Sequence, residues 1–432
     1  MIKFERFTLE NGLRVLFHKE PTTPMAVVNV LYDVGARDED PQQTGFAHLF
    51  EHLMFMGSRH APYPQFDRLL EAAGASNNGS TTTDRTNYYE SGPANSLPLM
   101  LWLEADRLGW MLETMDSAKV DLQRDVVKNE RRQSYENQPY GLAFEALASA
   151  IYPAGHPYSW TTIGSMADLS AASLEDVKSF FRTYYAPNNA TLVVAGDVRA
   201  DSVRTMVRTM FAEIPRGPAF TRPRVTPFAI RDTVITLEDR VQLPRLYLAW
   251  HGVREFHADD AALDLASYIL AGARNSRLTK ALVQDRPLAL VREQAIASEA
   301  NAFTFDLHKG SDLLVIDVVA RPGVAPEAIE AVVVAEVERL IADGVTAEER
   351  GRALALLETG WIAGLQSAGA RADKLSQFAT YRGDAALVNA EPERHAAVTV
   401  EALVAFARTW LVESNRATLL YVPQPTPAAE AA

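Results

Sequence analysis

Residues 44–57 read T-G-F-A-H-L-F-E-H-L-M-F-M-G. Most positions in this run are apolar, so we expect it to form a buried helix. Its ionisable side chains are His48, Glu51 and His52, and ionisable groups in a buried helix need partners. Two imidazoles four residues apart share one helix face and can bind one metal ion, with the carboxylate of Glu51 beside it. The run therefore predicts a metal-binding helix.

The spacing H-x-x-E-H is the inverted zinc-peptidase signature. A chain of this length and composition would contain it about 0.02 times by chance, which leaves core histidines hydrogen-bonded to an acid as the weaker alternative. Catalytic zinc usually takes three protein ligands, so a third must come from elsewhere. The best candidate is Glu130, in the charge-rich helical stretch 121–132. Taken alone, Glu130 fits a solvated helix residue better.

Composition restricts the possible functions. The chain has 432 residues, 47% hydrophobic and 22% charged, which indicates a globular protein with more than one core. A net charge of −13 without a basic cluster argues against nucleic-acid binding. The absence of cysteine excludes disulfides, thiolate metal sites and a cysteine nucleophile. A transition metal must therefore use histidine and carboxylate ligands.

No stretch of the chain has membrane-spanning length, and residues 1–16 lack the apolar core of a signal peptide. We expect a soluble chain, in the cytoplasm, or in the periplasm if a signal has been removed. The sequence also lacks a G-x-S-x-G motif, a phosphate-binding loop and a dinucleotide fingerprint. These absences remove support for serine hydrolase, nucleotide hydrolase and dehydrogenase functions.

The two halves of the chain resemble each other. Residues 173–183 match residues 399–409, which lie 226 positions later, and both stretches lead into similar apolar runs. A Pro- and Arg-rich stretch at 215–227 interrupts the pattern near the midpoint. An internal duplication is the simplest explanation. We predict three segments: a zinc-binding N-terminal domain at 1–216, a linker at 217–228, and a homologous C-terminal domain without a zinc motif at 229–432.

Alternating strand patterns, such as 27–32 and 245–250, precede long helical stretches in each half. This order indicates an α+β class, in which each domain is a mainly antiparallel sheet covered by helices.

Several motifs together resemble the pitrilysin/insulinase family of zinc metallopeptidases, in its short branch with the mitochondrial processing peptidase β-subunit and bacterial relatives. They are H-x-x-E-H, V-V-K-N-E-R-R at 126–132, N-Q-P-Y-G at 137–141 and Y-A-P-N-N-A at 185–190. The resemblance covers essentially the whole chain. It implies two domains forming half of a clamshell that a partner chain completes.

By the same resemblance, His48, His52 and Glu130 hold one zinc ion per chain, and Glu51 activates the attacking water. The physics agrees, because zinc lowers the pKa of its water and a nearby carboxylate can take the proton. Relatives usually carry a carboxylate seven residues before the ligand glutamate, whereas this chain has Gln123. Gln123 can still orient a ligand histidine by accepting a hydrogen bond, but it adds no charge.

Residues 74–89 resemble the family's edge strand, to which substrate adds as an extra strand. The matching positions are Asn78, Gly79 and Ser80. Without the zinc motif, the same stretch would equally fit a Thr-rich surface strand with an Asn-Gly turn.

The second half departs from the family pattern at two positions. Family members that act alone or as homodimers carry an Arg and, seven residues later, a Tyr that help to stabilise the substrate oxyanion. Here these positions are Val283 and Leu290, and neither side chain can donate a hydrogen bond. Either a homologous partner supplies Arg and Tyr in a heterodimer, or the enzyme is degenerate and weakly active. Loss of both donors beside a complete zinc motif favours the heterodimer.

The sequence therefore predicts the catalytic subunit of a zinc endopeptidase that cleaves extended peptides. The alternative is a non-hydrolytic subunit that binds peptides or scaffolds an assembly, which the intact motif disfavours. His156, in a turn that matches the family, is expected to be structural, and the remaining histidines lack metal-ligand spacing.

Overall fold

The computed structural model describes residues 1–222, 225, 228, 230, 233–287, 292–305 and 307–424. The chain divides into two compact units. The first unit comprises Met1–Arg131, Trp160–Arg224 and Trp361–Glu391, and the second comprises Arg132–Ser159, Val225–Gly360 and Pro392–Ala432. None of the described helices is long and apolar enough to cross a membrane.

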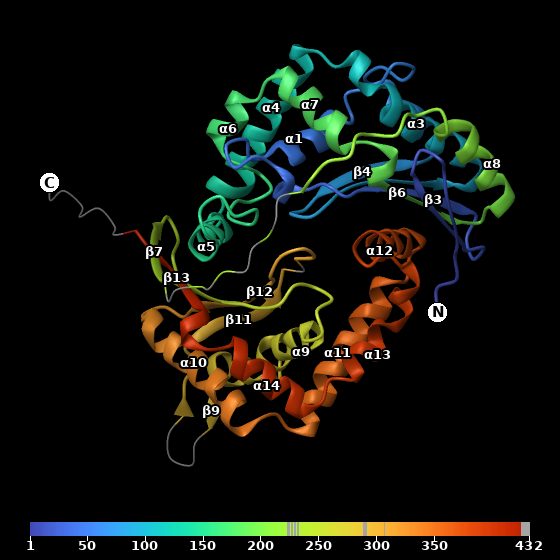
Figure 1. Cartoon of the computed structure of the whole chain (residues 1–432). Helices are drawn as coiled ribbons and strands as arrows, with labels where there is room; N and C mark the ends of the chain where they lie inside the picture. The colour runs from blue at the N-terminus through green and yellow to red at the C-terminus, as the bar shows by residue number, and fades with distance from the viewer. Residues whose placement is uncertain are drawn as a thin grey trace, which may run out of the picture. The chain divides into compact units, whose positions relative to one another are not determined.

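The first unit is built on a six-stranded mixed sheet (Figure 1), whose strands run in the order β1-β2-β6-β3-β5-β4. The strands are β1 (Glu5–Thr8), β2 (Arg14–Lys19), β3 (Met25–Tyr32), β4 (Ser76–Thr81), β5 (Thr86–Pro93) and β6 (Ala190–Gly196). Only the β2–β6 pair is parallel. β3 and β6 are almost wholly buried, as expected for central strands covered on both faces.

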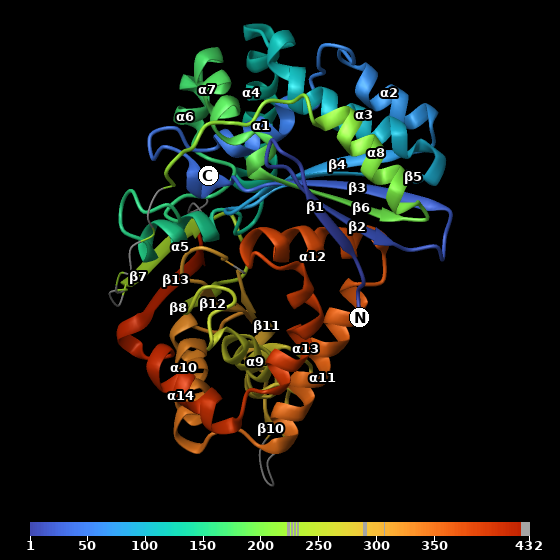
Figure 2. The same ribbon diagram turned by 45° about the vertical axis from the view of Figure 1, so that its right-hand side comes forward.

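Helices cover both faces of this sheet. α1 (Phe46–Leu53) packs on β4 and β5, and α3 (Leu97–Trp110) packs on β3. α12 (Ala368–Tyr381) packs on β3 and β6 from the opposite face, as Figure 2 shows. The other helices of the unit are α2 (Gln65–Ala72), α4 (Ser117–Arg131), α6 (Met166–Ala171), α7 (Leu174–Tyr184) and α8 (Ala200–Phe211).

The second unit contains a five-stranded sheet in the order β11-β12-β8-β13-β7. Its strands are β7 (Thr233–Asp239), β8 (Arg245–His251), β11 (Ala297–Thr304), β12 (Leu313–Ala320) and β13 (Arg416–Pro423), beside the short pair β9 (Arg286–Pro287) and β10 (Arg292–Glu293). Its helices are α5 (Ala143–Ile151), α9 (Asp260–Ala271), α10 (Pro326–Asp343), α11 (Ala347–Gly364, whose last turn belongs to the first unit), α13 (Glu391–Ala396) and α14 (Val400–Trp410). The predicted α+β class is confirmed for both units.

The two sheets share one topology. Apart from β1, the first sheet runs β2-β6-β3-β5-β4 and the second runs β7-β13-β8-β12-β11. In each, the first and last strands along the chain form the parallel pair, and the other pairs are antiparallel. Two duplicated halves would have this arrangement.

The compact units do not coincide with the halves that are continuous in sequence. α12 comes from the second half of the chain but packs on the first sheet, and α5 comes from the first half but packs on β13 and β7. The predicted division at 217–228 therefore describes the sequence repeat and stays a prediction. In the packed structure, each half of the chain contributes one segment to the compact unit formed mainly by the other half.

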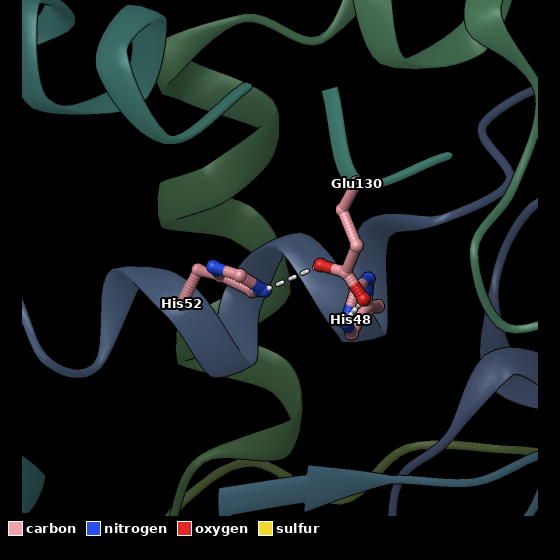
Figure 3. Close-up of side chains that lie close together, drawn as sticks. All are labelled: His48, His52 and Glu130. Atoms are coloured by element: carbon pink, nitrogen blue, oxygen red, sulfur yellow. Dashed lines mark ion pairs between the residues drawn. The ribbon is translucent and has the colours of Figure 1, made fainter. Parts of the chain in front are cut away.

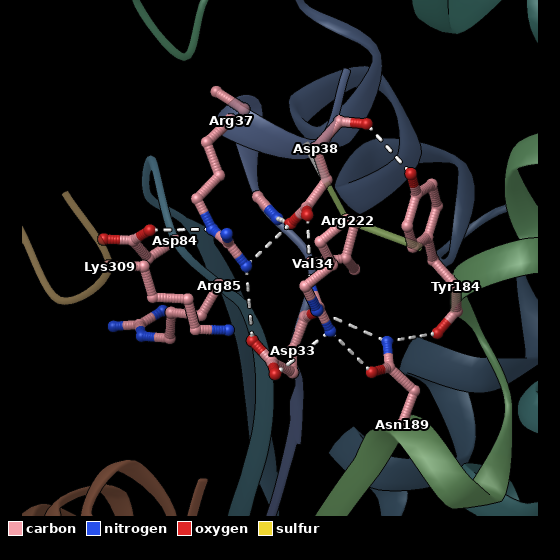
Figure 4. A network of polar contacts seen from close by, with 12 residues as sticks. Asp33, Val34, Arg37, Asp38, Asp84, Arg85, Tyr184, Asn189, Arg222 and Lys309 are labelled. Atoms are coloured by element: carbon pink, nitrogen blue, oxygen red, sulfur yellow. Dashed lines mark hydrogen bonds and ion pairs between the residues drawn. The ribbon is translucent and has the colours of Figure 1, made fainter. Parts of the chain in front are cut away.

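Arg222 attaches the chain leaving the first unit to that unit's sheet (Figure 4). Its guanidinium lies 2.9 Å from a carboxylate oxygen of Asp38 and 3.0 Å from one of Asp33, and it donates to Asn189 at 2.9 Å. Arg37 lies beside the same acids and forms an ion pair with Asp84 at 2.8 Å. Several charge-assisted contacts therefore fix the path of the chain up to residue 222.

Arg107 is a fully buried cation beneath the first sheet. It donates to Glu104 at 2.9 Å and lies 3.3 Å from Glu90, and all three side chains are at most 1% exposed. Its guanidinium also lies over the ring of Tyr88, 4.4 Å from the centroid. Burial raises the pKa of Glu90 well above its usual range, and Glu104 raises it further. The core of this unit therefore depends on a cation in a fixed place.

We expect Arg107→Leu to lower the free energy of unfolding by about 3 to 5 kcal/mol, because the substitution leaves Glu90 and Glu104 buried without a cation. Chemical denaturation measures this change. Arg204→Leu is the control, since its ion pair with Glu5 is partly exposed and its loss should cost less than about 1 kcal/mol. Equal small losses for both variants would contradict the assignment.

Candidate metal centre

Side-chain contacts fix the start of α1. Gly45, at φ 88°, precedes the helix, and the left-handed region favours glycine. The carboxylate of Glu39 accepts hydrogen bonds from the backbone N–H groups of Gly45 at 2.9 Å and Ala47 at 2.7 Å. Thr44 donates through its hydroxyl to Asp168 at 2.6 Å. A carboxylate on free N–H groups at a helix start stabilises the helix and sets its direction.

The buried face of α1 consists of Phe46, Ala47, Leu49, Phe50 and Leu53. This burial holds the helix rigidly, while His48, Glu51 and His52 are each only partly buried. The predicted helix is thus present, and its three ionisable side chains share a less enclosed face.

His48, His52 and Glu130 converge at the contact between α1 and α4 (Figure 3). Nε2 of His48 lies 3.7 Å from one carboxylate oxygen of Glu130, and Nε2 of His52 lies 3.4 Å from the other. One ligand atom from each of the three residues lies within 4.8 Å of the others. The structure therefore brings the three predicted ligands together, although Glu130 follows His52 by 78 residues in the sequence.

This donor set fits a zinc ion. Two ligands of a tetrahedral zinc, each at about 2.0 to 2.2 Å, lie roughly 3.3 to 3.6 Å apart, close to the two distances of 3.7 Å and 3.4 Å between the histidine nitrogens and the oxygens of Glu130. Burial, and then the neighbouring His52, lower the pKa of His48 to about 4, so its imidazole is neutral near pH 7 and its Nε2 can accept a metal. A hydrogen bond from His52 lowers the pKa of Glu130, which keeps this carboxylate ionised.

Glu51 lies on the same helix beside the edge strand β4. Its carboxylate accepts a hydrogen bond from Oγ1 of Thr81 at 2.5 Å. Burial raises the pKa of Glu51, although Thr81 partly opposes this. A carboxylate with increased proton affinity suits proton transfer near neutral pH.

Gly79 passes directly over Glu51. A Cβ atom at this position would lie 3.0 Å from Cγ of Glu51, so a larger residue would displace the carboxylate. The sequence indicated neither this close approach nor the role of Thr81. The period-two alternation of a strand, which places residues 79 and 81 on one face, could have indicated both.

Asn78, Gly79 and Ser80 all lie in β4, which is an edge strand that pairs, among the described strands, with β5 alone. Oδ1 of Asn78 accepts from the N–H of Gly79 at 2.8 Å. Ser80 accepts hydrogen bonds from Arg85 through its carbonyl oxygen at 3.1 Å and its hydroxyl at 2.7 Å. The predicted edge position is therefore present, next to Glu51.

Gln123 does not make the expected contact with a ligand histidine. Its Nε2 donates to Sδ of Met56 at 2.9 Å, and no hydrogen bond joins it to His48 or His52, all three being described residues. Nδ1 of His48 is buried without a hydrogen-bond partner among the described residues. The orienting role predicted for Gln123 is unsupported.

The two positions expected to lack the Arg and Tyr lie in the second unit. Val283 ends the π-helical segment η6 (Thr279–Val283) and packs, partly buried, against that unit's core. Leu290 lies outside the described residues. His156 stacks on Tyr152 and accepts from the N–H of Tyr158 at 3.1 Å, which suits the structural role expected of it.

Comparison with known proteins gives matches over most of the chain. The profile of the insulinase family (peptidase family M16) matches residues 14–161, and that of the peptidase M16 inactive domain matches residues 171–357. The zinc protease PqqE of Helicobacter pylori is 31% identical over 386 residues, which are 88% of this chain and 83% of that protein. A probable mitochondrial-processing peptidase subunit beta of Arabidopsis thaliana is 25% identical over 259 residues, 59% of this chain and 48% of that protein. The crystal structure of a protease from Helicobacter pylori superposes with a TM-score of 0.88 at 26% identity, covering 98% of this chain and 100% of that one.

We expect the chain to bind one zinc ion, and His48→Phe, His52→Phe or Glu130→Gln to weaken that binding at least about 100-fold, because each removes one of three ligands. Competition with a chromophoric chelator measures the affinity. His60→Phe is the matched control, since His60 lies in the same unit, bonded to Asp106 and outside the cluster. Unchanged affinity in the three ligand variants would overturn the assignment.

Proposed function

This chain belongs to the insulinase family of M16 peptidases, and on that premise we propose that it is the catalytic subunit of a zinc-dependent endopeptidase. The observation that carries the proposal is the convergence of His48, His52 and Glu130 within 4.8 Å, with Glu51 on the same helix as the histidines. Relatives named zinc proteases support the same reaction class. One zinc ion per chain follows from one ligand cluster among the described residues.

Zinc, when bound, lowers the pKa of a coordinated water and polarises the substrate carbonyl. His48, His52 and Glu130 would hold the ion. Glu51 would take a proton from the attacking water and later give it to the leaving amine, for which its raised proton affinity is suited. The hydrogen bond from Thr81 and the close contact with Gly79 hold the Glu51 carboxylate in place.

The edge of β4 would hold the substrate. An extended peptide that adds to β4 gains main-chain hydrogen bonds whatever its sequence, and its scissile bond would lie beside Glu51. Asn78, Gly79 and Ser80 would then contact the peptide. Asn78 already accepts from the N–H of Gly79, so this contact must rearrange if that N–H is to bind substrate.

A homologous partner would supply the missing oxyanion donors. The side chain of Val283 packs against the apolar core of the second unit and has no N–H or O–H group with which to donate a hydrogen bond. A relative named as the beta subunit of a mitochondrial processing peptidase supports a division of the site between chains.

A second candidate function is a non-hydrolytic peptide-binding or scaffolding subunit. The match of residues 171–357 to an inactive-domain profile and the apolar residue at 283 favour it. The complete ligand cluster with Glu51 disfavours it, because a scaffold has no need for a base beside a metal site. Turnover that depends on Glu51 separates the two candidates.

We expect Glu51→Gln to retain zinc and to lower kcat by about 10²- to 10⁴-fold, since glutamine preserves the shape but cannot accept the proton. Hydrolysis of a quenched unstructured peptide, with zinc content determined on the same sample, measures both effects. Glu71→Gln is the control, because Glu71 is an exposed acid on α2 of the same unit. Loss of zinc in the Glu51 variant would contradict its assignment as the base.

We expect the zinc-loaded chain alone to cleave this peptide slowly, and a mixture with a homologous chain carrying the Arg/Tyr pair to be at least about 10²-fold faster, the usual effect of one oxyanion donor. The initial rate against the ratio of the two chains gives the stoichiometry. Full activity of the chain alone would mean that it supplies its own oxyanion donors.

A further inference from the structure

A cavity of about 800 Å³ lies within the first unit, on the face of the sheet that α12 covers. Strands β3, β4 and β5, the segment between β2 and β3, and the start of α12 form its wall. All of its lining residues belong to this one unit. A peptide residue occupies on the order of 100 Å³, so the space is large enough for several residues.

The cavity and the metal centre share β4 as a wall. Gly79 and Thr81 point towards Glu51 on one face of the sheet, whereas Ser80, between them, lines the cavity on the other face. This alternation is the normal period of a strand. A peptide lying at the β4 edge can therefore reach Glu51 on one side and the cavity on the other.

Two buried asparagines face into the cavity. Asn29 on β3 is 1% exposed and Asn87 on β5 is 2% exposed, and Oδ1 of each lacks a hydrogen-bond partner among the described residues. Nδ2 of Asn87 donates to Asp373 at 3.2 Å, which fixes the orientation of that amide. Unpaired buried amides destabilise a fold, and a covered sheet face normally carries Val, Ile or Leu here. Each of the two oxygens can therefore accept a hydrogen bond from a ligand.

The start of α12 offers the opposite chemistry. Ser367 caps the helix by accepting from the N–H of Ala370, while Ala368 and Gly369 line the cavity without bulky side chains. Backbone N–H groups at a helix start lack intrahelical acceptors and favour an oxygen ligand. The cavity thus presents acceptors from the sheet and donors from the helix.

The charges around the cavity balance. Arg371 pairs with Glu20 at 2.7 Å, and Arg85 and Asp373 contribute one charge of each sign. Val27 and Tyr89 add apolar surface. A neutral ligand with N–H donors, C=O acceptors and apolar side groups matches this lining, and a peptide backbone has all three.

We propose that this cavity is a second peptide-binding site, which holds an uncharged part of the substrate remote from the scissile bond. The proposal rests on the proposed peptidase function. Backbone N–H groups of the substrate would donate to Asn29 and Asn87, and a carbonyl oxygen would accept from the start of α12. The path from Glu51 to Asn29 crosses two strand spacings, about 10 Å, and passes from one face of the sheet to the other, roughly 10 Å more. An extended chain spans these two distances together in about six residues.

The test uses the full chain and two uncharged, acetylated and amidated peptides that share a scissile sequence, one of about five residues and one of about sixteen. Gly369→Phe fills the cavity, because a Cβ at Gly369 meets only Oγ of Ser367, at 3.9 Å. Gly364→Phe is the matched control: Gly364 belongs to the same unit, has open space around it and does not line the cavity.

Fluorescence anisotropy of the labelled long peptide is measured on the Glu51→Gln background, where hydrolysis cannot interfere. We expect Gly369→Phe to weaken binding at least about tenfold and Gly364→Phe to leave it unchanged. On the wild-type background, Gly369→Phe should raise KM for the long peptide and leave kcat and the short peptide unaffected. Equal affinity of both variants for the long peptide would overturn the proposal. Failure to cleave the short peptide would overturn the peptidase function, while the binding result would still decide on the cavity.

Asn29→Leu provides a second test, which separates ligand binding by Asn29 from a purely structural role. The side-chain Oδ1 of Asn29 accepts no hydrogen bond from the described residues, so leucine of similar size should leave the melting temperature unchanged or higher. Affinity for the long peptide should fall about fivefold, the effect of one lost hydrogen bond. A lower melting temperature with unchanged affinity would mean that Asn29 serves the fold and not a ligand.

Discussion

The candidate metal centre depends on one constraint, which is that α1 must be buried while it carries three ionisable side chains. The helix meets this constraint by facing the core with Phe46, Leu49, Phe50 and Leu53 and by turning its histidines towards Glu130. Glu130 adds a negative charge to the cluster, which the two neutral imidazoles lack. Glu39 fixes the start of the same helix, so the direction in which the histidines point is set by contacts remote from them. Rigid support of this kind is what a metal site requires.

The strand β4 packs against α1 and connects it to the sheet of the first unit. Because side chains alternate along it, one strand places Gly79 and Thr81 against Glu51 and presents Ser80 to the opposite face. An edge strand that pairs with no described strand on one side and has two different chemical environments on its faces can contact a peptide at more than one point. In the function and the second site proposed above, catalysis and recognition share this one strand, without a separate binding domain.

The sequence predicted much of this site, for identifiable reasons. Local spacing determined His48, Glu51 and His52, since one helical turn brings them together. Resemblance to a family was needed for Glu130, because no local pattern tells which of many helical acids faces inward. Thr81 and Glu39 were missed, as their roles depend on tertiary contacts, and the hydrogen bond that Gln123 was expected to accept from a ligand histidine is not formed, while its Nε2 donates to Met56. The α+β class followed from alternation, but the packing of α12 on the first sheet did not, because a helix pattern does not specify which sheet it covers.

The second unit contains a helix that corresponds to α1 but is buried differently. Its helix α9 follows β8 as α1 follows β3, and it packs on β11 and β12 much as α1 packs on β4 and β5. Almost every residue of α9 is buried, and Ala and Leu occupy most of its positions. The same topology therefore accommodates either a helix that is buried on nearly all sides, as α9 is, or a helix such as α1 whose ionisable side chains are only partly buried. The candidate metal centre of the first unit lies where α1 keeps three ionisable side chains only partly buried, with Glu130 of α4 beside its two histidines.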